Sequence, residues 1–380
     1  MAWPAEVSLT LLVAGDPGQL TGGYLYDARI VEALRARGCG VEVVGLEGRF
    51  PDPDAHARRS MAMALEAQPD GACVVIDGLA MGGLPEAIAP HAHRLVIVAL
   101  VHHPLADESG LAEADRRRLF DSERRALALA RRVVVTSAFT ARRLAHYGVP
   151  RPRLRVVTPG VDPAPLAASA LDLEAPGPRR LLCVATLTPR KGHDLLLEAL
   201  AGLQGHDWRL EAIGSHARDP AHAARLFDAT RRYGLAERIV WAGERSAAEL
   251  AAAYHRAELC VLPSRYEGYG MVVTEALARG LQVLTTTGGA LANTLPPGAG
   301  MAVPPGDAAA LGEALGRWLD DTALRRRLRH GACAARRSLG DWPQAGERFL
   351  AALASLPLAA RSFQPLSAPD AGHDLEESSP

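Results

Sequence analysis

The stretch PSRYEGYGMVVTEA, residues 263–276, decides the fold of this chain. It follows a short apolar run and leads into a helical pattern, so it predicts a glycine-rich loop that joins a strand to a helix. Gly268 and Gly270 free the loop backbone, and its amides and the helix N-terminus can then face an anion. Glu267 on the loop can accept hydrogen bonds from sugar hydroxyls, and Glu275 in the helix can accept a pair from a ribose.

A second strand–loop–helix stretch, LLCVATLTPRKGHD, covers residues 181–194. It contains Lys191, the only lysine among 42 basic residues in the chain. Lysine and arginine are not interchangeable, so a lone lysine in an arginine-dominated chain needs an explanation. A cation at this position can neutralise the charge that builds on a departing diphosphate.

Short apolar runs alternate with amphipathic helical stretches along both halves of the chain. The first half contains strand-like runs at 7–14, 41–46, 72–77, 94–101, 133–136 and 154–157, and the second at 180–185, 209–213, 239–242, 259–263, 282–286 and 301–303. Strands that alternate with helices predict parallel, doubly wound sheets of the α/β class. Ligands of such sheets bind at the carboxyl ends of the strands, so the two halves are expected to face one another across a cleft.

The alternation stops once, in a Pro- and Ala-rich segment, and this break divides the chain. We expect a Rossmann-like domain at 1–162, a linker at 163–179, a second Rossmann-like domain at 180–341, a terminal helix at 342–356 that crosses back to the first domain, and a disordered tail at 357–380.

Composition excludes several other classes of function. The formal net charge is −1, which gives no general reason to expect a nucleic-acid partner. No apolar run is long enough to span a bilayer, the N-terminus lacks the pattern of a signal peptide, and the five cysteines have no metal-type spacing. We therefore expect a cytoplasmic protein, with the inner face of the membrane as an alternative location.

Residues 263–276 resemble the Glu-x7-Glu signature of the group 1 (family four) retaining glycosyltransferases of the GT-B fold, and the resemblance extends from about residue 9 to residue 353. It implies an enzyme of the hexosyltransferase type with a nucleoside-diphosphate sugar as co-substrate and no cofactor. It also implies that Lys191 stabilises the leaving diphosphate and that Glu275 holds the nucleotide ribose. The donor-binding loop is then Gly268, Tyr269, Gly270 and Met271. The resemblance further implies that the domain at 1–162 binds the acceptor and that the domain at 180–341 binds the nucleotide-sugar donor.

Two motifs of the N-terminal half resemble further elements of the same family. Thr21-Gly22-Gly23-Tyr24 is similar to the glycine loop that approaches the reacting centre. The motif Val101-His-His-Pro is similar to a strand end whose histidine contacts the donor sugar. The resemblance implies that His102 orients the sugar together with Glu267, and His103 is the alternative.

The chain departs from the family at two positions. Thr186 stands where the family commonly has arginine, and Ala292 where it usually has glutamate. Arg190 is our candidate for the missing diphosphate contact. The two departures keep a non-catalytic nucleotide-sugar-binding protein open as an alternative. A dinucleotide-dependent oxidoreductase is less favoured, because no Gly-x-Gly-x-x-Gly follows the first strand.

The remaining expectations concern partners and metals. No Asp-x-Asp element is placed as a donor-metal clamp, so we expect no metal. A UDP-sugar is the default donor, the acceptor is unidentified, and the oligomeric state is not readable from the sequence. The arginine-rich stretch 112–132 is interleaved with acidic residues, which favours a solvated helix face over a weak peripheral contact with an anionic membrane.

Overall fold

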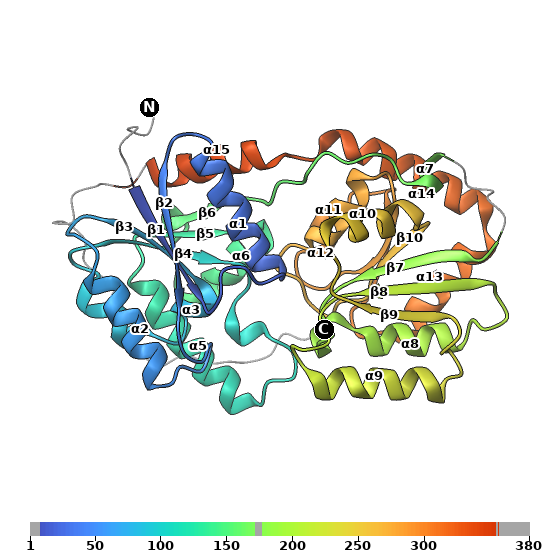
Figure 1. The fold of residues 1–380 in the computed structure, drawn as a ribbon, viewed down its shortest axis with the longest axis horizontal. Coiled ribbons are helices and arrows are strands. Elements are labelled where there is room, and N and C mark those ends of the chain that lie inside the picture. The colour runs from blue at the N-terminus through green and yellow to red at the C-terminus, as the bar shows by residue number, and fades with distance from the viewer. Residues whose placement is uncertain (1–7, 172–176, 355, 357–380) are drawn as a thin grey trace.

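The structure, a computed structural model, describes residues 8–171, 177–354 and 356, and the expected disordered tail at 357–380 lies outside this part of the chain. The chain folds into two α/β halves that lie side by side along the long axis of the molecule (Figure 1). Each half is built on one six-stranded parallel sheet, so the predicted α/β class with two doubly wound domains is confirmed.

The first sheet has the strand order β2-β1-β3-β4-β5-β6. Its strands are β1 (Ser8–Ala14), β2 (Gly40–Leu46), β3 (Cys73–Asp77), β4 (Val96–Val101), β5 (Arg132–Val135) and β6 (Leu154–Val156). The central strands are buried on both faces, which is why β4 is a continuous apolar run rather than an alternating one. The direction of winding reverses between β1 and β3.

The second sheet has the strand order β12-β11-β10-β7-β8-β9. Its strands are β7 (Arg179–Val184), β8 (Trp208–Ile213), β9 (Ile239–Gly243), β10 (Leu259–Leu262), β11 (Gln282–Thr286) and β12 (Gly300–Val303). Winding reverses between β7 and β10, which are neighbours in the sheet. Such a reversal is the point at which doubly wound sheets bind nucleotides, because the loops after the two strands diverge to opposite faces.

Helices cover both faces of the first sheet. They are α1 (Gly22–Arg35), α2 (Ala55–Glu66), α3 (Gly78–Met81), α4 (Pro85–Ile88), α5 (Glu113–Ala128) and α6 (Ala138–Arg143). On one face, apolar side chains of α1 pack on the sheet, with Tyr26 fully buried. On the other face α2 to α5 do so, with Met61 and Leu65 fully buried. Two apolar layers therefore fix the sheet and the loops at its edge.

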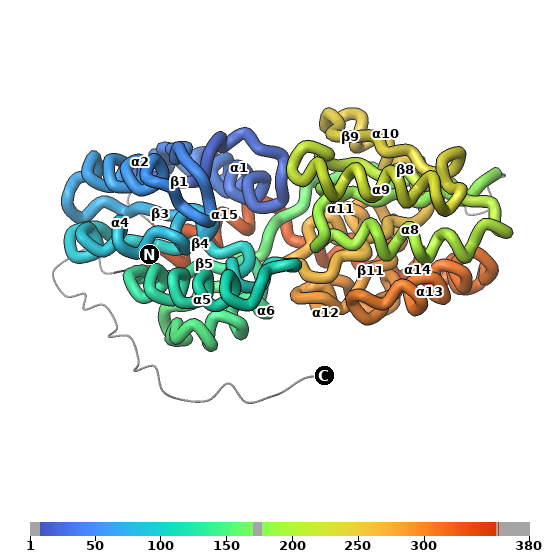
Figure 2. Tube along the Cα trace, turned by 90° about the horizontal axis from the view of Figure 1, so that it is seen from below, coloured from blue at the N-terminus to red at the C-terminus, as the bar shows by residue number. Residues whose placement is uncertain are grey.

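The second half is built in the same way (Figure 2). Its helices are α7 (Ala168–Leu171, within the expected linker), α8 (His193–Ala201), α9 (Pro220–Arg232), α10 (Ala247–Arg256), α11 (Met271–Ala278), α12 (Leu291–Thr294), α13 (Ala308–Asp320) and α14 (Thr322–Ala335). One apolar core joins α8 to α14 to the sheet and encloses Trp208 and Trp318 completely.

The last described helix, α15 (Trp342–Ala354), follows the second half but packs on the first. Its Gly346 lies directly against Ala33 of α1, and the ring of Trp342 meets that of Tyr26 edge to face at 5.9 Å. Figure 1 shows α15 beside α1. The chain thus links its two halves twice, once through residues 157–178 and once through the segment before α15.

Candidate active site

The loops after β7 and β10 meet at the reversal point of the second sheet. Lys191 ends a short turn, Pro189–Lys191, in the first loop, and Glu267 lies in the second. Nζ of Lys191 is 2.5 Å from Oε1 of Glu267, and the hydroxyl of Ser264 donates to the same oxygen at 2.7 Å. Two residues 76 positions apart in the sequence thus form an ion pair at the place where the fold favours an anionic ligand.

Glu267 is almost completely buried and is ionised. Burial favours the neutral acid, but the positive charges of Lys191 and Arg190 outweigh it and lower the pKa of Glu267 to about 2. Burial lowers the pKa of Lys191, and the carboxylate of Glu267 opposes that effect. A buried carboxylate held between two cations and a hydroxyl has a fixed orientation, which suits a group that must orient a substrate.

Arg190 joins the two halves of the molecule. Its Nη1 donates to the backbone oxygen of Tyr266 at 2.9 Å and lies 3.3 Å from Oε2 of Glu267. Its Nε lies 3.1 Å from Oε1 of Glu108, which belongs to the first half. Burial tends to raise the pKa of Glu108, but the neighbouring ring of His103 and the charge of Arg190 lower that pKa to about 2.

Glu275 occupies a different part of the site. It lies in α11, and its Oε2 accepts a hydrogen bond of 2.9 Å from the hydroxyl of Tyr254, a fully buried residue of α10. Burial raises the pKa of Glu275. The guanidinium of Arg279 stacks over the ring of Tyr254 at 4.5 Å, so the tyrosine that orients this carboxylate is itself held in place.

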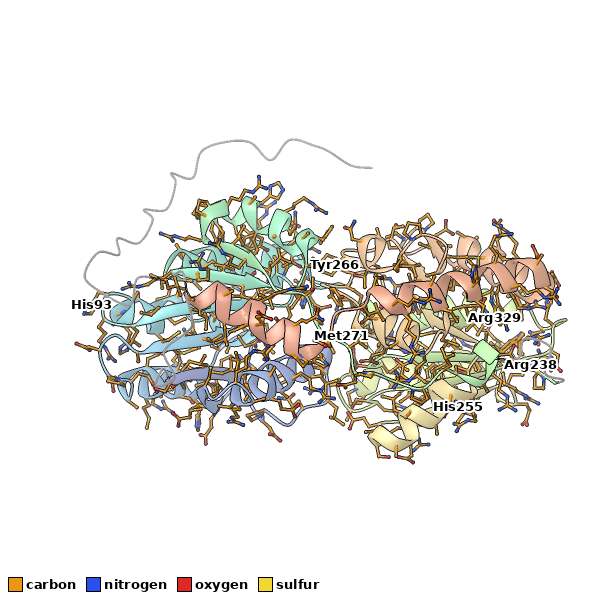
Figure 3. The ribbon with its side chains drawn as sticks, turned by 90° about the horizontal axis from the view of Figure 1, so that it is seen from above. His93, Arg238, His255, Tyr266, Met271 and Arg329 are labelled. Atoms are coloured by element: carbon orange, nitrogen blue, oxygen red, sulfur yellow. The ribbon has the colours of Figure 1, made fainter. Side chains whose placement is uncertain are left out.

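The loop between Glu267 and α11 touches the first half. A Cβ atom on Gly268 would lie 1.9 Å from the backbone oxygen of His102, so only glycine allows this approach. Met271, the first residue of α11, packs against the apolar cluster of α1 and α15. Figure 3 shows Tyr266 and Met271 where the two halves meet.

The first half contributes a polar cluster at the carboxyl edge of its sheet. His102 follows β4, and its Nε2 lies 3.0 Å from Oδ1 of Asp27 and 3.6 Å from Oδ1 of Asp77. The ring of His103 faces Glu108 instead, with Nε2 3.4 Å from Oε2. Ligand-type atoms of Asp27, Asp77 and His102 all lie within 4.8 Å of one another, so within the described residues this is the group that could hold a metal ion.

The structure brings most of the expected site residues to the junction of the two halves. Gly22 and Gly23 begin α1, and a Cβ on Gly23 would lie 3.1 Å from the ring of His102. The loop after β11 also reaches the site, because the amide of Ala290 donates to the backbone oxygen of Glu267 at 2.8 Å. Ala292, one of the two departures from the family pattern, is exposed in α12.

Four polar residues of this region were not predicted from the sequence: Asp27, Asp77, Glu108 and Tyr254. Asp77 could have been predicted, because it ends a buried strand that lies beside β4, the strand that His102 follows. Asp27 carries a weaker signal, four residues after the Gly22-Gly23 pair. Glu108 and Tyr254 lie in a loop and a helix whose patterns show no chemistry.

Most of the arginine-rich stretch forms α5, and most of the helix's cations have acidic neighbours. Arg131 and Arg132 instead lie after the helix, at the start of β5, and are buried, so the predicted solvated face does not include them. Arg117 pairs with Glu113 at 2.9 Å, Arg118 with Asp52 at 2.9 Å, and Arg125 with Glu86. These intramolecular pairs weaken the field that an anionic membrane would need. Across the part of the chain that the structure describes, no helix has the length and apolar character to cross a bilayer.

Comparison with known proteins gives the same family for both halves. The sequence model of "Glycosyltransferase Family 4" matches residues 26–165, and that of "Glycosyl transferases group 1" matches residues 172–333. A D-inositol 3-phosphate glycosyltransferase of Nocardia farcinica is 31% identical over 274 residues, which cover 67% of this chain and 60% of that protein. The corresponding protein of Kineococcus radiotolerans is 33% identical over 286 residues, covering 67% and 65%. The alignments therefore span less than two thirds of these relatives.

Solved structures agree on the fold. A sucrose-phosphate synthase of Thermosynechococcus elongatus superposes with a TM-score of 0.77 at 23% identity, over 92% of this chain and 98% of that one. The Anabaena protein HepE, in complex with UDP and glucose, superposes with a TM-score of 0.71 at 18% identity, over 91% and 99%. The superpositions show the GT-B fold, and the two family models, which match residues 26–165 and 172–333, show that the chain belongs to the group 1 glycosyltransferases.

Proposed function

We propose that the chain is a retaining glycosyltransferase that moves a sugar from a nucleoside-diphosphate donor to an acceptor. The observation that carries the proposal is the cluster of Lys191, Arg190 and Glu267 at the reversal point of the second sheet. It offers two cations for a diphosphate and a fixed carboxylate for a sugar within a few ångströms. The shared fold alone does not favour this chemistry, because related folds serve many functions.

Lys191 and Arg190 serve the leaving group in this proposal. When the bond between the sugar and the diphosphate breaks, negative charge accumulates on the departing phosphate oxygen. Preorganised positive charge in a buried site stabilises that charge more than water does. Arg190 lies beside Lys191 and Glu267, so it is placed to supply the contact that Thr186 cannot make.

The remaining residues hold the other parts of the donor. Glu275 accepts hydrogen bonds from the two ribose hydroxyls, and the backbone amides of the Gly268–Met271 loop and of the α11 N-terminus face the diphosphate. Glu267 and His102 approach the sugar from opposite halves of the molecule. This division explains why the donor loop and the end of β4 are in direct contact.

Retention follows if the acceptor attacks from the face that the diphosphate leaves. The acceptor oxygen forms its bond to the anomeric carbon as the bond to the phosphate oxygen breaks. The acceptor proton passes to the departing phosphate oxygen, so no separate base and no metal is required by this scheme. Cations beside the diphosphate stabilise the same charge throughout the step.

UDP-glucose is our first choice of donor, since HepE, which has the same fold, has been crystallised with UDP and glucose. D-Inositol 3-phosphate is a first acceptor to test, because the names of the relatives point to it. The rival function is nucleotide-sugar binding without transfer, which the Thr186 and Ala292 departures favour.

The test has two stages. Thermal unfolding with UDP, GDP, ADP and NAD comes first, because a ligand at 100 times its dissociation constant stabilises a protein by about 2.7 kcal/mol. Release of the nucleoside diphosphate is then measured from the matching nucleotide sugar, with and without acceptor. Stabilisation by a nucleoside diphosphate with acceptor-dependent release supports the proposal. Stabilisation without release supports a nucleotide-sugar-binding protein that does not transfer the sugar. Stabilisation by NAD alone contradicts both of these functions.

A further inference from the structure

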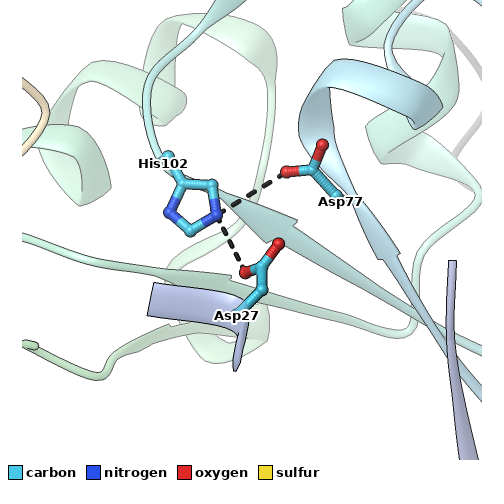
Figure 4. A group of neighbouring side chains, drawn as sticks. All are labelled: Asp27, Asp77 and His102. Carbon is cyan, nitrogen blue, oxygen red and sulfur yellow. Dashed lines mark hydrogen bonds and ion pairs between the residues drawn. The ribbon is translucent and has the colours of Figure 1, made fainter. Parts of the chain in front are cut away.

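The side chain of His102 is held by two carboxylates on one of its two ring nitrogens (Figure 4). Nε2 lies 3.0 Å from Oδ1 of Asp27 and 3.6 Å from Oδ1 of Asp77. Both aspartates are buried, with 5% of each residue exposed. The three side chains come from α1, from the end of β3 and from the end of β4, so the fold itself assembles the group.

The contacts of the ring leave its other nitrogen unoccupied. Tyr26 meets the ring edge to face at 5.3 Å, and Gly23 lies against Cδ2. Among the described residues Nδ1 of His102 has no hydrogen-bond partner, and 20% of the side chain is exposed. The ring therefore points Nε2 at the two aspartates and leaves Nδ1 available to a ligand.

The chemistry of the contact fixes the proton on the buried nitrogen. An ionised carboxylate only accepts hydrogen bonds, so Nε2 must carry its proton to donate to Asp27. Burial lowers the pKa of His102, but the charge of Asp27, its hydrogen bond and the charge of Asp77 outweigh burial and raise it. The groups that face His102 are thus Asp27 and Tyr26 of α1 and Asp77 of β3, and burial and the charge of Asp27 raise the pKa of Asp77 to about 7.

The backbone of His102 places this group at the donor loop, because its carbonyl oxygen lies directly against Gly268. We propose that Asp27 is a positioning residue, which fixes the ring of His102 with Nε2–H on its carboxylate and so presents Nδ1 to the donor sugar. The inference rests on the proposed function and deepens it. Asp27 touches no substrate in this scheme and acts only through His102, whereas Asp77, at the longer distance, contributes less.

The first test distinguishes an effect on sugar recognition from an effect on nucleotide binding. Asp27→Asn keeps the shape of the side chain and removes its charge, and Asp27→Ala removes the contact. Hydrogen bonds to charged groups predict a loss of roughly ten- to a hundredfold in kcat/KM with UDP-glucose for both variants. The dissociation constant of UDP, which lacks the sugar, stays within about twofold of the wild-type value. Glu32→Gln, which changes an exposed carboxylate of the same helix, is the matched control and leaves both quantities unchanged.

The second test reads the ring directly and does not depend on turnover. The NMR signals of the His102 imidazole titrate at lower pH in Asp27→Asn than in the wild type, because the charge that favours the protonated ring is gone. Asp77→Asn moves the titration less. Wild-type kcat/KM in both Asp27 variants, or an equal loss of UDP and UDP-glucose binding, would overturn the inference. A wild-type protein that binds neither UDP nor UDP-glucose would instead overturn the proposed function, and the inference with it, whatever the ring titration shows.

Discussion

The ammonium nitrogen of Lys191 lies 2.5 Å from Oε1 of Glu267 and links the loops after two neighbouring strands, β7 and β10. The pair is largely buried, with 18% of the lysine side chain and 9% of the glutamate side chain exposed. A largely buried ion pair is costly to break on one side only, because the remaining charge is left buried without a partner. Substitution of either residue should therefore have a larger effect than substitution of a residue in an exposed ion pair.

Replacing Lys191 by alanine removes the cation that we assign to the leaving diphosphate. Loss of one preorganised group of this kind typically reduces turnover by roughly 10²- to 10³-fold, and we expect that loss in kcat with UDP-glucose. Arg231→Ala is the matched control, because Arg231 is an exposed cation of α9 that pairs with Asp228. Equal kcat values for wild type and Lys191→Ala would contradict the assignment, provided that the variant unfolds cooperatively.

Glu275 and Tyr254 are predicted to control recognition of the ribose. A charged hydrogen bond is worth about 1.5–3 kcal/mol, so the wild type should bind UDP at least roughly tenfold more tightly than its 2′- or 3′-deoxy analogue. Glu275→Ala should abolish this preference, and Tyr254→Phe should reduce it by releasing the carboxylate. Titration calorimetry with UDP and both deoxy analogues measures the effect. If Glu275→Ala still binds UDP more tightly than the deoxy analogues, the ribose hydroxyls do not contact Glu275.

Much of this arrangement follows from the sequence. The apolar runs of β7 and β10 and the loop stretches that follow them predict which loops reach the nucleotide site, because strand ends of a parallel sheet share one edge. The single lysine points to a special position without any structure. The sequence alone therefore predicts that Lys191 and Glu267 bind the same ligand, and the structure places the two side chains in contact.

The supporting residues could not be predicted in this way. Asp27 is 75 positions from His102, and Glu108 is 82 positions from Arg190. Each pairing depends on how a helix or loop turns over the edge of the sheet. An acidic residue at such a place has the same local pattern as a solvated one, so periodicity and spacing carry no signal. Only the packed three-dimensional structure decides which acid meets the histidine or the arginine.

The ion pair of Glu108 with Arg190 should make donor binding depend on the contact between the two halves. A diphosphate that binds Arg190 competes with Glu108 for the guanidinium, so Glu108→Gln should increase UDP affinity. The glutamate side chain is 41% exposed, and exposed pairs are worth up to about 1 kcal/mol, so the expected gain is only about two- to fivefold. Calorimetry at low and high salt measures it, and the difference between variant and wild type should shrink with salt. Unchanged or weaker UDP binding would show that Arg190 stays with Glu108 when the donor binds.

Glu123 gives a prediction about stability that is independent of the reaction. It is buried in α5, its Oε2 accepts a hydrogen bond of 2.8 Å from the amide of Leu105, and its Oε1 has no partner among the described residues. Burial raises the pKa of Glu123 to about 8, although the hydrogen bond from Leu105 opposes this, so the folded protein holds a proton there that the unfolded chain releases above about pH 4.3. The stability from this raised pKa is complete below pH 4.3 and is lost as the pH rises toward 8.

Glu123→Gln should remove that loss, since an amide keeps the bond to Leu105 and has no proton to release. The free energy of unfolding of the variant relative to wild type should therefore rise between pH 5 and 8, by at most about 1.4 kcal/mol per pH unit, because one proton is exchanged. Urea unfolding at several pH values measures this difference. Asp121→Asn, an exposed carboxylate in the same helix, is the control and should show no such trend. A constant difference between Glu123→Gln and wild type would mean that Glu123 is ionised in the folded protein, and that the field around α5 compensates its burial.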